Sequence, residues 1–316
     1  MSETKSPGRH AVVIGGSMGG LLSARVLSDY FDNVTVVERD EVGDSVEPRK
    51  GVPQGNHVHT IYGGGANVVE RLLPGLFEKM VSEGATECDF SKGLVWYHQG
   101  VWKMRTDTGL TSFWQSRAFL ESHIRRRVRE FSNVNIIENC DAESLLSTDD
   151  NSQVTGVRVT HRNDDRTEEL PADLVVDTSG RGSKTPEWLE QLGYQKPKEL
   201  AVGIDLAYAS RIYERPDDSS RDWTVMGLFP TPPASQTSRL HLSDRRTTLD
   251  CQRRGISGRS SAGRRRGIPG IREKPGTAGL LRSDQRRQTT DTVGDVSLSG
   301  RGSAGATSCC RGFRKD

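Results

Sequence analysis

Aromatic residues are almost absent from the last quarter of the chain. Of the 19 Phe, Trp and Tyr residues, 18 lie at or before Phe229, and only Phe313 follows. Because aromatic side chains bury large areas in protein cores, the capacity to form a core ends near residue 229. The hydrophobic fraction of 33% over 316 residues is low for a compact enzyme, as expected if one part of the chain differs from the rest.

Long apolar segments are also absent. No run approaches the roughly 20 apolar residues that a membrane-spanning helix needs. The polar stretch from Met1 to His10 lacks the apolar region of a secretory signal. We therefore expect a soluble, cytoplasmic protein with no membrane span.

The five cysteines form no C-x-x-C pattern, and Cys88 and Cys140 are isolated. A zinc site or a redox disulfide is therefore not predicted. His57 and His59 are close enough in sequence to share a metal, but no carboxylate or cysteine pattern completes such a site. We expect no metal and interpret both histidines as loop residues.

Charge divides the chain at nearly the same point as the aromatic residues. Residues 239–316 contain 18 Lys and Arg against 7 Asp and Glu, whereas the preceding 238 residues contain 26 against 35. The net charge of +2 therefore averages an acidic part and a basic part, and it says little about the folded part.

The N-terminal segment has the pattern of a βαβ unit. Ala11 to Ile14 is a short apolar run of the kind that forms a buried parallel strand. Apolar residues then recur at helical spacing from Leu21 to Tyr30, and Val34 to Glu38 is a second apolar run. In such a unit the turn after the first strand lies at the edge of an open sheet, where nucleotides bind.

The same periodicities predict the remaining elements. A helix is expected over residues 68–80, with an interruption near Pro74. A second is expected over residues 117–131, and its solvated face is predicted to carry Arg125, Arg126, Arg127 and Arg129. Strands are expected over residues 134–138, 154–161 and 174–176, and strands of a second sheet over residues 93–105, 201–211 and 224–229.

A glycine-rich turn joins the first strand to the first helix. It reads Gly15-Gly16-Ser17-Met18-Gly19-Gly20. Gly15 permits the tight turn, Gly20 lets the helix pack closely on the strand, and the helix N-terminus offers N–H groups to a pyrophosphate. Ser17 stands where the dinucleotide fingerprint usually has its middle glycine. Glu38 ends the second strand 18 residues after Gly20, where a carboxylate can accept hydrogen bonds from ribose hydroxyls.

These motifs resemble those of an enzyme family. The chain contains the run VVIGGSMGGLLSARVLSDYFDNVTVVERD, followed by PRKGVPQGNHVH. These segments resemble the N-terminus of FAD-dependent monooxygenases and epoxidases, a family related to the aromatic hydroxylases and polyprenyl-methoxyphenol hydroxylases. Residues 177–183, DTSGRGS, resemble the second flavin motif of this family. The resemblance covers about residues 9–233 and implies FAD binding, but it does not identify a substrate.

The resemblance also implies where the cofactor contacts lie. The glycine turn and Glu38 would hold the ADP half of FAD, Arg49 and Gln54 would lie on a loop that runs past the flavin, and Arg117 would open a helix beside the cofactor. In the second motif, Ser179 replaces the usual Asp, and Asp177 is expected to substitute for it in part. The implied cofactor-binding residues are Gly15, Gly16, Ser17, Met18, Gly19, Gly20, Glu38, Arg39, Arg49, Gln54, Arg117, Asp177, Gly180 and Ser183.

The chemistry implied by the family is reduction of FAD by NAD(P)H and transfer of oxygen from O2 to an organic substrate. We therefore expect an FAD-dependent oxidoreductase, an NAD(P)H-dependent monooxygenase that hydroxylates or epoxidises a hydrophobic small molecule. Because the cofactor carries the bond-making chemistry, no catalytic side chain is predicted. An FAD-dependent reductase of isoprenoid double bonds has the same fingerprint and stays open as an alternative.

After Pro233 the resemblance implies the end of the substrate sheet, then a Gly-Asp motif at the ribityl chain and a closing helix. None of the three is recognised in sequence that resembles the family, and the only Gly-Asp pair in this segment is Gly294-Asp295. One interpretation is an out-of-frame translation; the other is a non-catalytic fragment whose basic tail binds nucleic acid. Codons can be chosen for residues 267–281 and 291–301 that, read one base later, give segments similar to the family, which favours the frameshift. We therefore expect impaired FAD binding and no nucleic-acid partner.

The predicted fold is α/β. A discontinuous Rossmann-like FAD-binding domain of the aromatic-hydroxylase type is expected over residues 1–85 and 106–195. An inserted β-sheet substrate domain is expected over residues 86–105 and 196–233, followed by a disordered tail over residues 234–316.

Overall fold

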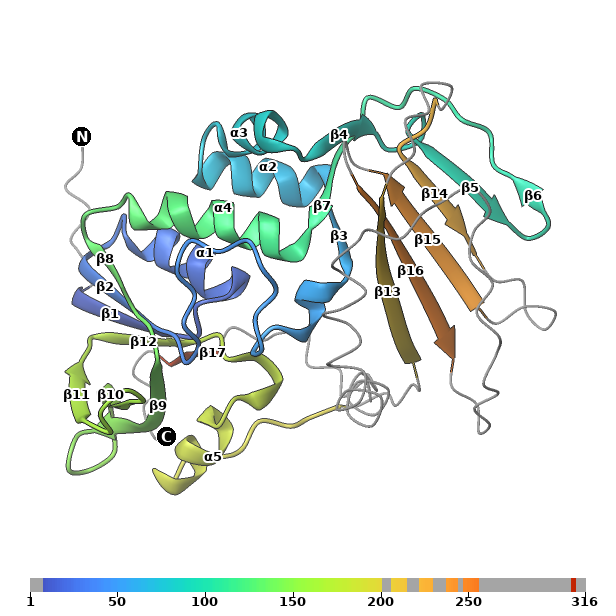
Figure 1. Cartoon of the computed structure of the whole chain (residues 1–316). Coiled ribbons are helices and arrows are strands. Elements are labelled where there is room, and N and C mark those ends of the chain that lie inside the picture. The colour runs from blue at the N-terminus through green and yellow to red at the C-terminus, as the bar shows by residue number, and fades with distance from the viewer. Residues whose placement is uncertain are drawn as a thin grey trace.

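The computed structural model describes residues 8–200, 206–214, 222–229, 237–243, 247–255 and 308–310. A Rossmann-like α/β region contains the N-terminal strand, and a mostly antiparallel sheet lies beside it (Figure 1). The codon-based frame interpretation concerns residues 267–281 and 291–301, which lie outside the described residues.

The α/β region is built on a five-stranded sheet with the order β17-β12-β1-β2-β8. Four of its strands are parallel: β1 (Gly8–Ile14), β2 (Phe31–Val37), β8 (Val134–Ile137) and β12 (Leu174–Asp177). The fifth strand, β17 (Ser308–Cys310), pairs antiparallel with β12. Helix α1 (Met18–Leu27) follows β1, so the βαβ unit predicted from the hydrophobic pattern is confirmed.

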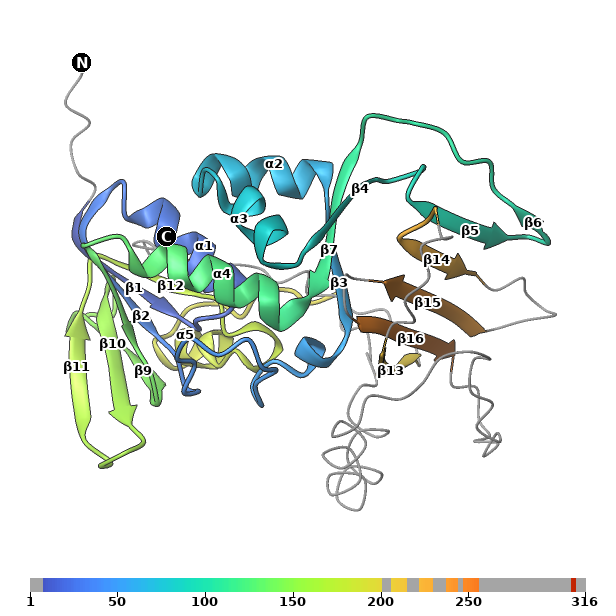
Figure 2. The ribbon, with the colours of Figure 1, turned by 45° about the horizontal axis from the view of Figure 1, so that its top comes forward.

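The apolar run of β1 arises because the strand is buried on both faces. Ala11 and Val13 pack into one core, and Val12 and Ile14 pack into another, as the alternation of strand side chains requires. The first core is covered by α1, α2 (Gly63–Leu72), α3 (Leu76–Glu83) and α4 (Arg117–Arg129). The second is covered by a meander of β9 (Cys140–Ser147), β10 (Val154–His161) and β11 (Thr167–Pro171), which lies across the sheet from α1 and α4 (Figure 2).

The interruption expected near Pro74 is confirmed. α2 ends at Leu72 and α3 begins at Leu76. Between them Gly75 adopts a left-handed conformation with φ +79°, which a glycine adopts at little cost. Proline lacks the N–H that would continue the first helix.

A three-stranded sheet with the order β3-β7-β4 adjoins the helices. It contains β3 (Val58–Tyr62), β4 (Thr86–Asp89) and β7 (Thr111–Ser116). β7 leads directly into α4, where the Ser116 hydroxyl accepts a hydrogen bond from the Phe119 N–H at 3.1 Å and caps the helix. This cap fixes the start of α4, and with it the position of Arg117, the first residue of the helix.

The second sheet has the order β13-β16-β15-β14-β5-β6. Its strands are β5 (Leu94–His98), β6 (Val101–Trp102), β13 (Leu206–Glu214), β14 (Val225–Leu228), β15 (Thr237–Ser243) and β16 (Thr247–Gly255). β15 and β16 pair in an antiparallel hairpin, so the sheet runs past the boundary expected at residue 233. Backbone pairing with β14 and β13 stabilises these strands, and such pairing does not depend on aromatic residues.

Among the described helices, none combines the length and apolar character needed to cross a bilayer.

Candidate nucleotide-binding site

The turn after β1 requires glycine at two positions. Gly15 has φ +97°, and its N–H donates to the Val37 carbonyl at 2.8 Å. At Gly20, a Cβ atom would lie 1.7 Å from the Gly15 carbonyl oxygen and 2.9 Å from Thr178 Oγ1. The first turn of α1 therefore packs directly on the end of β1, the close approach that defines a dinucleotide turn.

Ser17 is the N-cap of α1, but its side chain makes no capping hydrogen bond. Its hydroxyl instead donates to Glu121 Oε2 at 2.7 Å. The N–H groups of the first helical turn have no partner within the helix, and the helix dipole favours a negative charge at this end. An anion such as a diphosphate fits this position.

Glu38 is buried immediately after β2 and faces the glycine turn. Its Oε2 accepts a hydrogen bond from the Gly16 N–H at 2.7 Å, and its Oε1 accepts one from the Asp40 N–H at 2.9 Å. Arg49 forms an ion pair with the same carboxylate at 3.0 Å. Because a carboxylate has about four acceptor positions, Glu38 can also accept hydrogen bonds from a ligand hydroxyl.

A crevice of about 450 Å³ opens at the carboxyl ends of the parallel strands, the place where open α/β sheets bind ligands. Of the residues expected at the cofactor, five line it: Gly15, Ser17, Glu38, Arg39 and Arg49. Gln54 is exposed in the short helix η1 (Pro53–Asn56), and Met18 packs against the first core. These two residues are thus placed away from the crevice lining.

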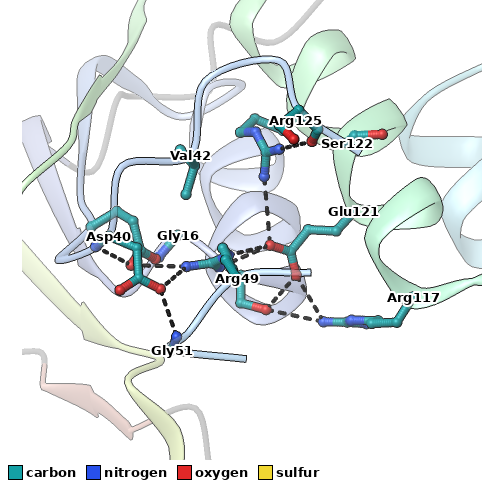
Figure 3. Close-up of polar contacts among 12 residues, drawn as sticks. Gly16, Asp40, Val42, Arg49, Gly51, Arg117, Glu121, Ser122 and Arg125 are labelled. Carbon is teal, nitrogen blue, oxygen red and sulfur yellow. Dashed lines mark hydrogen bonds and ion pairs between the residues drawn. The ribbon is translucent and has the colours of Figure 1, made fainter. Parts of the chain in front are cut away.

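Three arginines surround the buried carboxylate of Glu121, as Figure 3 shows. Arg49 contacts it at 2.8 Å, Arg117 at 3.2 Å and Arg125 at 3.5 Å. Burial alone would lower the pKa of the Arg49 guanidinium, but the carboxylates of Glu38 and Glu121 raise it above its usual value. Burial lowers the pKa of Arg117 and of Arg125.

The interpretation of the α4 arginines as a solvated face is wrong for Arg125, which is only 3% exposed. Its Nε donates to the Gly43 carbonyl at 3.0 Å, and its terminal nitrogen donates to the Ser45 carbonyl at 3.2 Å. The loop after β2 folds over α4 and supplies these acceptors. Periodicity within one helix cannot reveal a partner on a distant loop.

The second motif forms a tight loop after β12, organised by the buried side chain of Asp177. This carboxylate accepts hydrogen bonds from the Ser179 N–H at 2.8 Å and from Thr185 Oγ1 at 2.6 Å, and also from the Ser183 hydroxyl. Gly180 follows with φ +74° and begins the short helix η2 (Gly180–Gly182). Asp177 and Ser183 thus shape the loop that forms one wall of the crevice.

Thr178 and Glu121 were not singled out from the sequence, yet both join segments of the site. Thr178 Oγ1 donates to the Ile14 carbonyl at 2.7 Å and to the Gly15 carbonyl at 2.9 Å, so it fastens the second motif to the glycine turn. The only sequence signal for Thr178 is its place in the DTSGRGS motif.

His57 and His59 lie near the boundary between the two regions. Burial lowers the pKa of both imidazoles, so both are neutral at pH 7. His57 Nδ1 lies 2.7 Å from Ser210 Oγ on β13. In the described part of the chain, no three side chains of His, Cys, Asp or Glu form a group that could hold a metal.

Cys140 lines the crevice and is 1% exposed. Burial, with Asp141 and Glu168 nearby, raises the pKa of its thiol to about 11. At pH 8 the reactive thiolate is then about a thousandth of the population. We expect iodoacetamide to modify Cys140 at least tenfold more slowly in the native protein than in urea, with a native rate that rises between pH 8 and 10. Mass spectrometry of the Cys140 peptide measures both rates, and equal rates would contradict the burial.

Comparisons with known proteins agree with this geometry. No family model matches the chain. The protein Rv3254 of Mycobacterium tuberculosis is 38% identical over 220 residues, which are 67% of this chain and 46% of that protein. The chain thus spans less than half the length of this curated relative.

Several solved structures resemble the chain at low sequence identity. PqsL of Pseudomonas aeruginosa, a probable FAD-dependent monooxygenase, has a TM-score of 0.57 and 13% identity, and the match covers 93% of this chain and 71% of that one. The p-nitrophenol 4-monooxygenase PnpA of Pseudomonas putida DLL-E4 has a TM-score of 0.57 and 18% identity, with 89% and 62% covered. PieE, a flavin-dependent monooxygenase solved with FAD and substrate, has a TM-score of 0.56 and 17% identity, with 87% and 46% covered. This chain therefore has the fold of the FAD-dependent monooxygenases of the aromatic-hydroxylase type.

Proposed function

We propose that the chain binds FAD in the crevice and derives from an NAD(P)H-dependent monooxygenase that acts on a hydrophobic small molecule. The observation that carries the proposal is the contact between Gly20 and Gly15, with Glu38 facing the same turn. A turn this tight at a strand-to-helix junction leaves room for a diphosphate against the helix N-terminus.

We assign the ADP half of FAD to particular residues. The first turn of α1 would bind the diphosphate, and Glu38 would accept hydrogen bonds from the ribose hydroxyls. Arg39 is exposed at the edge of the crevice, where it would face the adenosine end. Arg49 and Arg117 would add positive charge close to the diphosphate and the flavin.

Bound FAD would supply the redox chemistry, accepting hydride from NAD(P)H and allowing oxygen transfer from O2. The chain itself would orient the cofactor and keep water from the reacting end. Substrates named for similar proteins support a small organic substrate: PqsL was solved with 2-aminobenzoylacetate, and PnpA is named for p-nitrophenol. We extend this class, a small cyclic organic molecule, to the ancestral reaction of this chain.

Cofactor affinity is expected to be impaired, because the described residues would supply the ADP half of the site, whereas the ribityl half that the resemblance implies would come from the segment after Pro233, which is interpreted as out of frame. Retention of FAD through purification is therefore not expected. Added FAD should bind reversibly and saturably instead.

Titration of the purified full chain with FAD, followed by quenching of flavin fluorescence, tests the proposal. We expect saturable binding that Glu38→Gln weakens about tenfold, which corresponds to ~1.4 kcal/mol. Asp32→Asn, at an exposed position of β2, the strand that precedes Glu38, serves as the control and should bind like the original chain. Absence of saturable binding, or equal affinity of the Glu38→Gln variant, would contradict the proposal.

A further inference from the structure

We infer that Glu121 is a positioning residue for the cofactor site, acting through Ser17, Arg49 and Arg117. This inference rests on the proposed function and concerns a residue that lies outside both glycine-containing motifs. Glu121 lies one turn after Arg117 on α4, on the side of the helix that faces the glycine turn.

The Glu121 carboxylate is the point where three separate segments meet. Its Oε2 accepts hydrogen bonds from Ser17 Oγ at 2.7 Å and from Arg117 at 3.2 Å. Its Oε1 accepts a hydrogen bond from Arg49 Nε at 2.9 Å. One side chain thus connects the N-terminus of α1, the loop after β2 and the start of α4, and Figure 3 shows Arg49 and Arg117 converging on it.

Glu121, Arg49 and Arg117 are all largely buried, so each of these charges depends on its partners in the cluster. The Glu121 side chain is 5% exposed, and those of Arg49 and Arg117 are 13% and 12% exposed. A charge so far removed from water needs a partner of opposite sign. For Arg117, Glu121 is the only carboxylate within ion-pair distance among the described residues. The Ser17 hydroxyl, which accepts from Arg117 at 3.0 Å, carries no charge, so we expect the guanidinium to move toward solvent without Glu121.

Arg49 behaves differently because it has two further carboxylates, Glu38 and Asp40, each at 3.0 Å. Without Glu121, it would be drawn entirely toward these two. Glu38 would then pair more closely with Arg49 and would be less able to accept hydrogen bonds from ribose. Loss of Glu121 is therefore expected to disturb both the sugar contact and the cationic side of the site.

The hydroxyl of Ser17 adds a third consequence. While it donates to Glu121, it stays turned away from the first-turn N–H groups of α1. The hydroxyl also accepts a hydrogen bond from Arg117 at 3.0 Å. Once Glu121 is lost and Arg117 is displaced, the Ser17 oxygen is free to accept from these N–H groups, as an N-cap serine commonly does. That would remove donors from a diphosphate. All three effects weaken binding, and they are opposed only by the attraction of Arg117 and Arg125, which would lose Glu121 as their carboxylate partner.

The test compares Glu121→Gln with the original chain by two measurements. The first is affinity for FAD and for ADP, measured at a temperature where circular dichroism shows both proteins folded. The second needs no ligand: the rate of trypsin cleavage after Arg49 and Lys50, in the loop that Glu121 fastens. We expect affinity to fall at least tenfold for both ligands, and cleavage to accelerate at least fivefold. Glu121→Asp should recover part of both.

Glu130→Gln is the matched control, because Glu130 lies at the end of the same helix with an exposed side chain. It should change neither measurement. Unchanged affinity or unchanged cleavage in Glu121→Gln, with the original chain binding FAD, would overturn the inference alone. If the original chain binds neither FAD nor ADP, the proposed function fails and the inference fails with it.

Discussion

Replacing Gly20 with alanine is expected to prevent stable folding of the α/β region and to abolish FAD binding. The added Cβ would lie 1.7 Å from the Gly15 carbonyl oxygen, which is a backbone atom that no rotamer change can move. Overpacking costs about 1 to 3 kcal/mol where side chains can adjust. Here the helix must move away from the strand, so we expect a loss above ~3 kcal/mol, a large part of the total stability of a domain. Thermal unfolding followed by circular dichroism measures it.

Gly19→Ala is the matched control for this prediction. A Cβ at Gly19 would approach the side chain of Thr178 no closer than 3.6 Å, which is an ordinary contact. Alanine also favours a helix over glycine by about 1 kcal/mol. We expect Gly19→Ala to be neutral or slightly stabilising. If the two variants unfold at the same temperature, the close packing of α1 on β1 is not as described.

The sequence predicted those parts of the fold that depend on residues close together in the chain. The runs in β1 and β2 are apolar because each strand is buried on both faces, and the turn between β1 and α1 needs its glycines for conformation and contact. Both signals lie within about thirty residues. Such local signals identify the βαβ unit and the edge of the sheet where a nucleotide binds.

The contacts that complete the site are long-range, and the sequence did not predict them. Ser17 and Glu121 are 104 residues apart, and Arg49 and Glu121 are 72 apart. No periodicity connects such positions, and helical spacing alone gave Arg125 a solvated position. The fold decides these pairings, because it brings the loop after β2 against α4.

Strands with weak sequence patterns were also missed. β9 and β11 carry charged residues at alternate or successive positions, and each relies on β10 for its backbone partners. β15 and β16 contain no aromatic residue, although each has two neighbours in the sheet. Pairing with neighbouring strands outweighs local propensity in such strands. A prediction based on where the aromatic residues stop therefore ends the second sheet before β15 and β16.

Replacing Asp177 with alanine is expected to destabilise the protein by ~3 kcal/mol or more and to weaken FAD binding. The buried carboxylate accepts hydrogen bonds from the Ser179 N–H and hydroxyl and from the hydroxyls of Ser183 and Thr185. Each buried donor left without an acceptor costs about 1 to 3 kcal/mol, and the hydroxyls recover part of this by turning toward water. The loop also holds Thr178 against the glycine turn, so its disorder would open the crevice wall.

Urea unfolding of two variants separates the carboxylate from its individual partners. Ser183→Ala removes one donor and leaves the carboxylate in place, so we expect a loss of about 1 kcal/mol and little change in FAD affinity. Asp177→Ala should shift the urea midpoint at least twice as far, with an unchanged slope if both variants unfold in two states. If the two variants shift the midpoint equally, Asp177 does not organise the loop as a unit. A large loss of stability without a loss of FAD affinity would show instead that the loop supports the fold but not the nucleotide site.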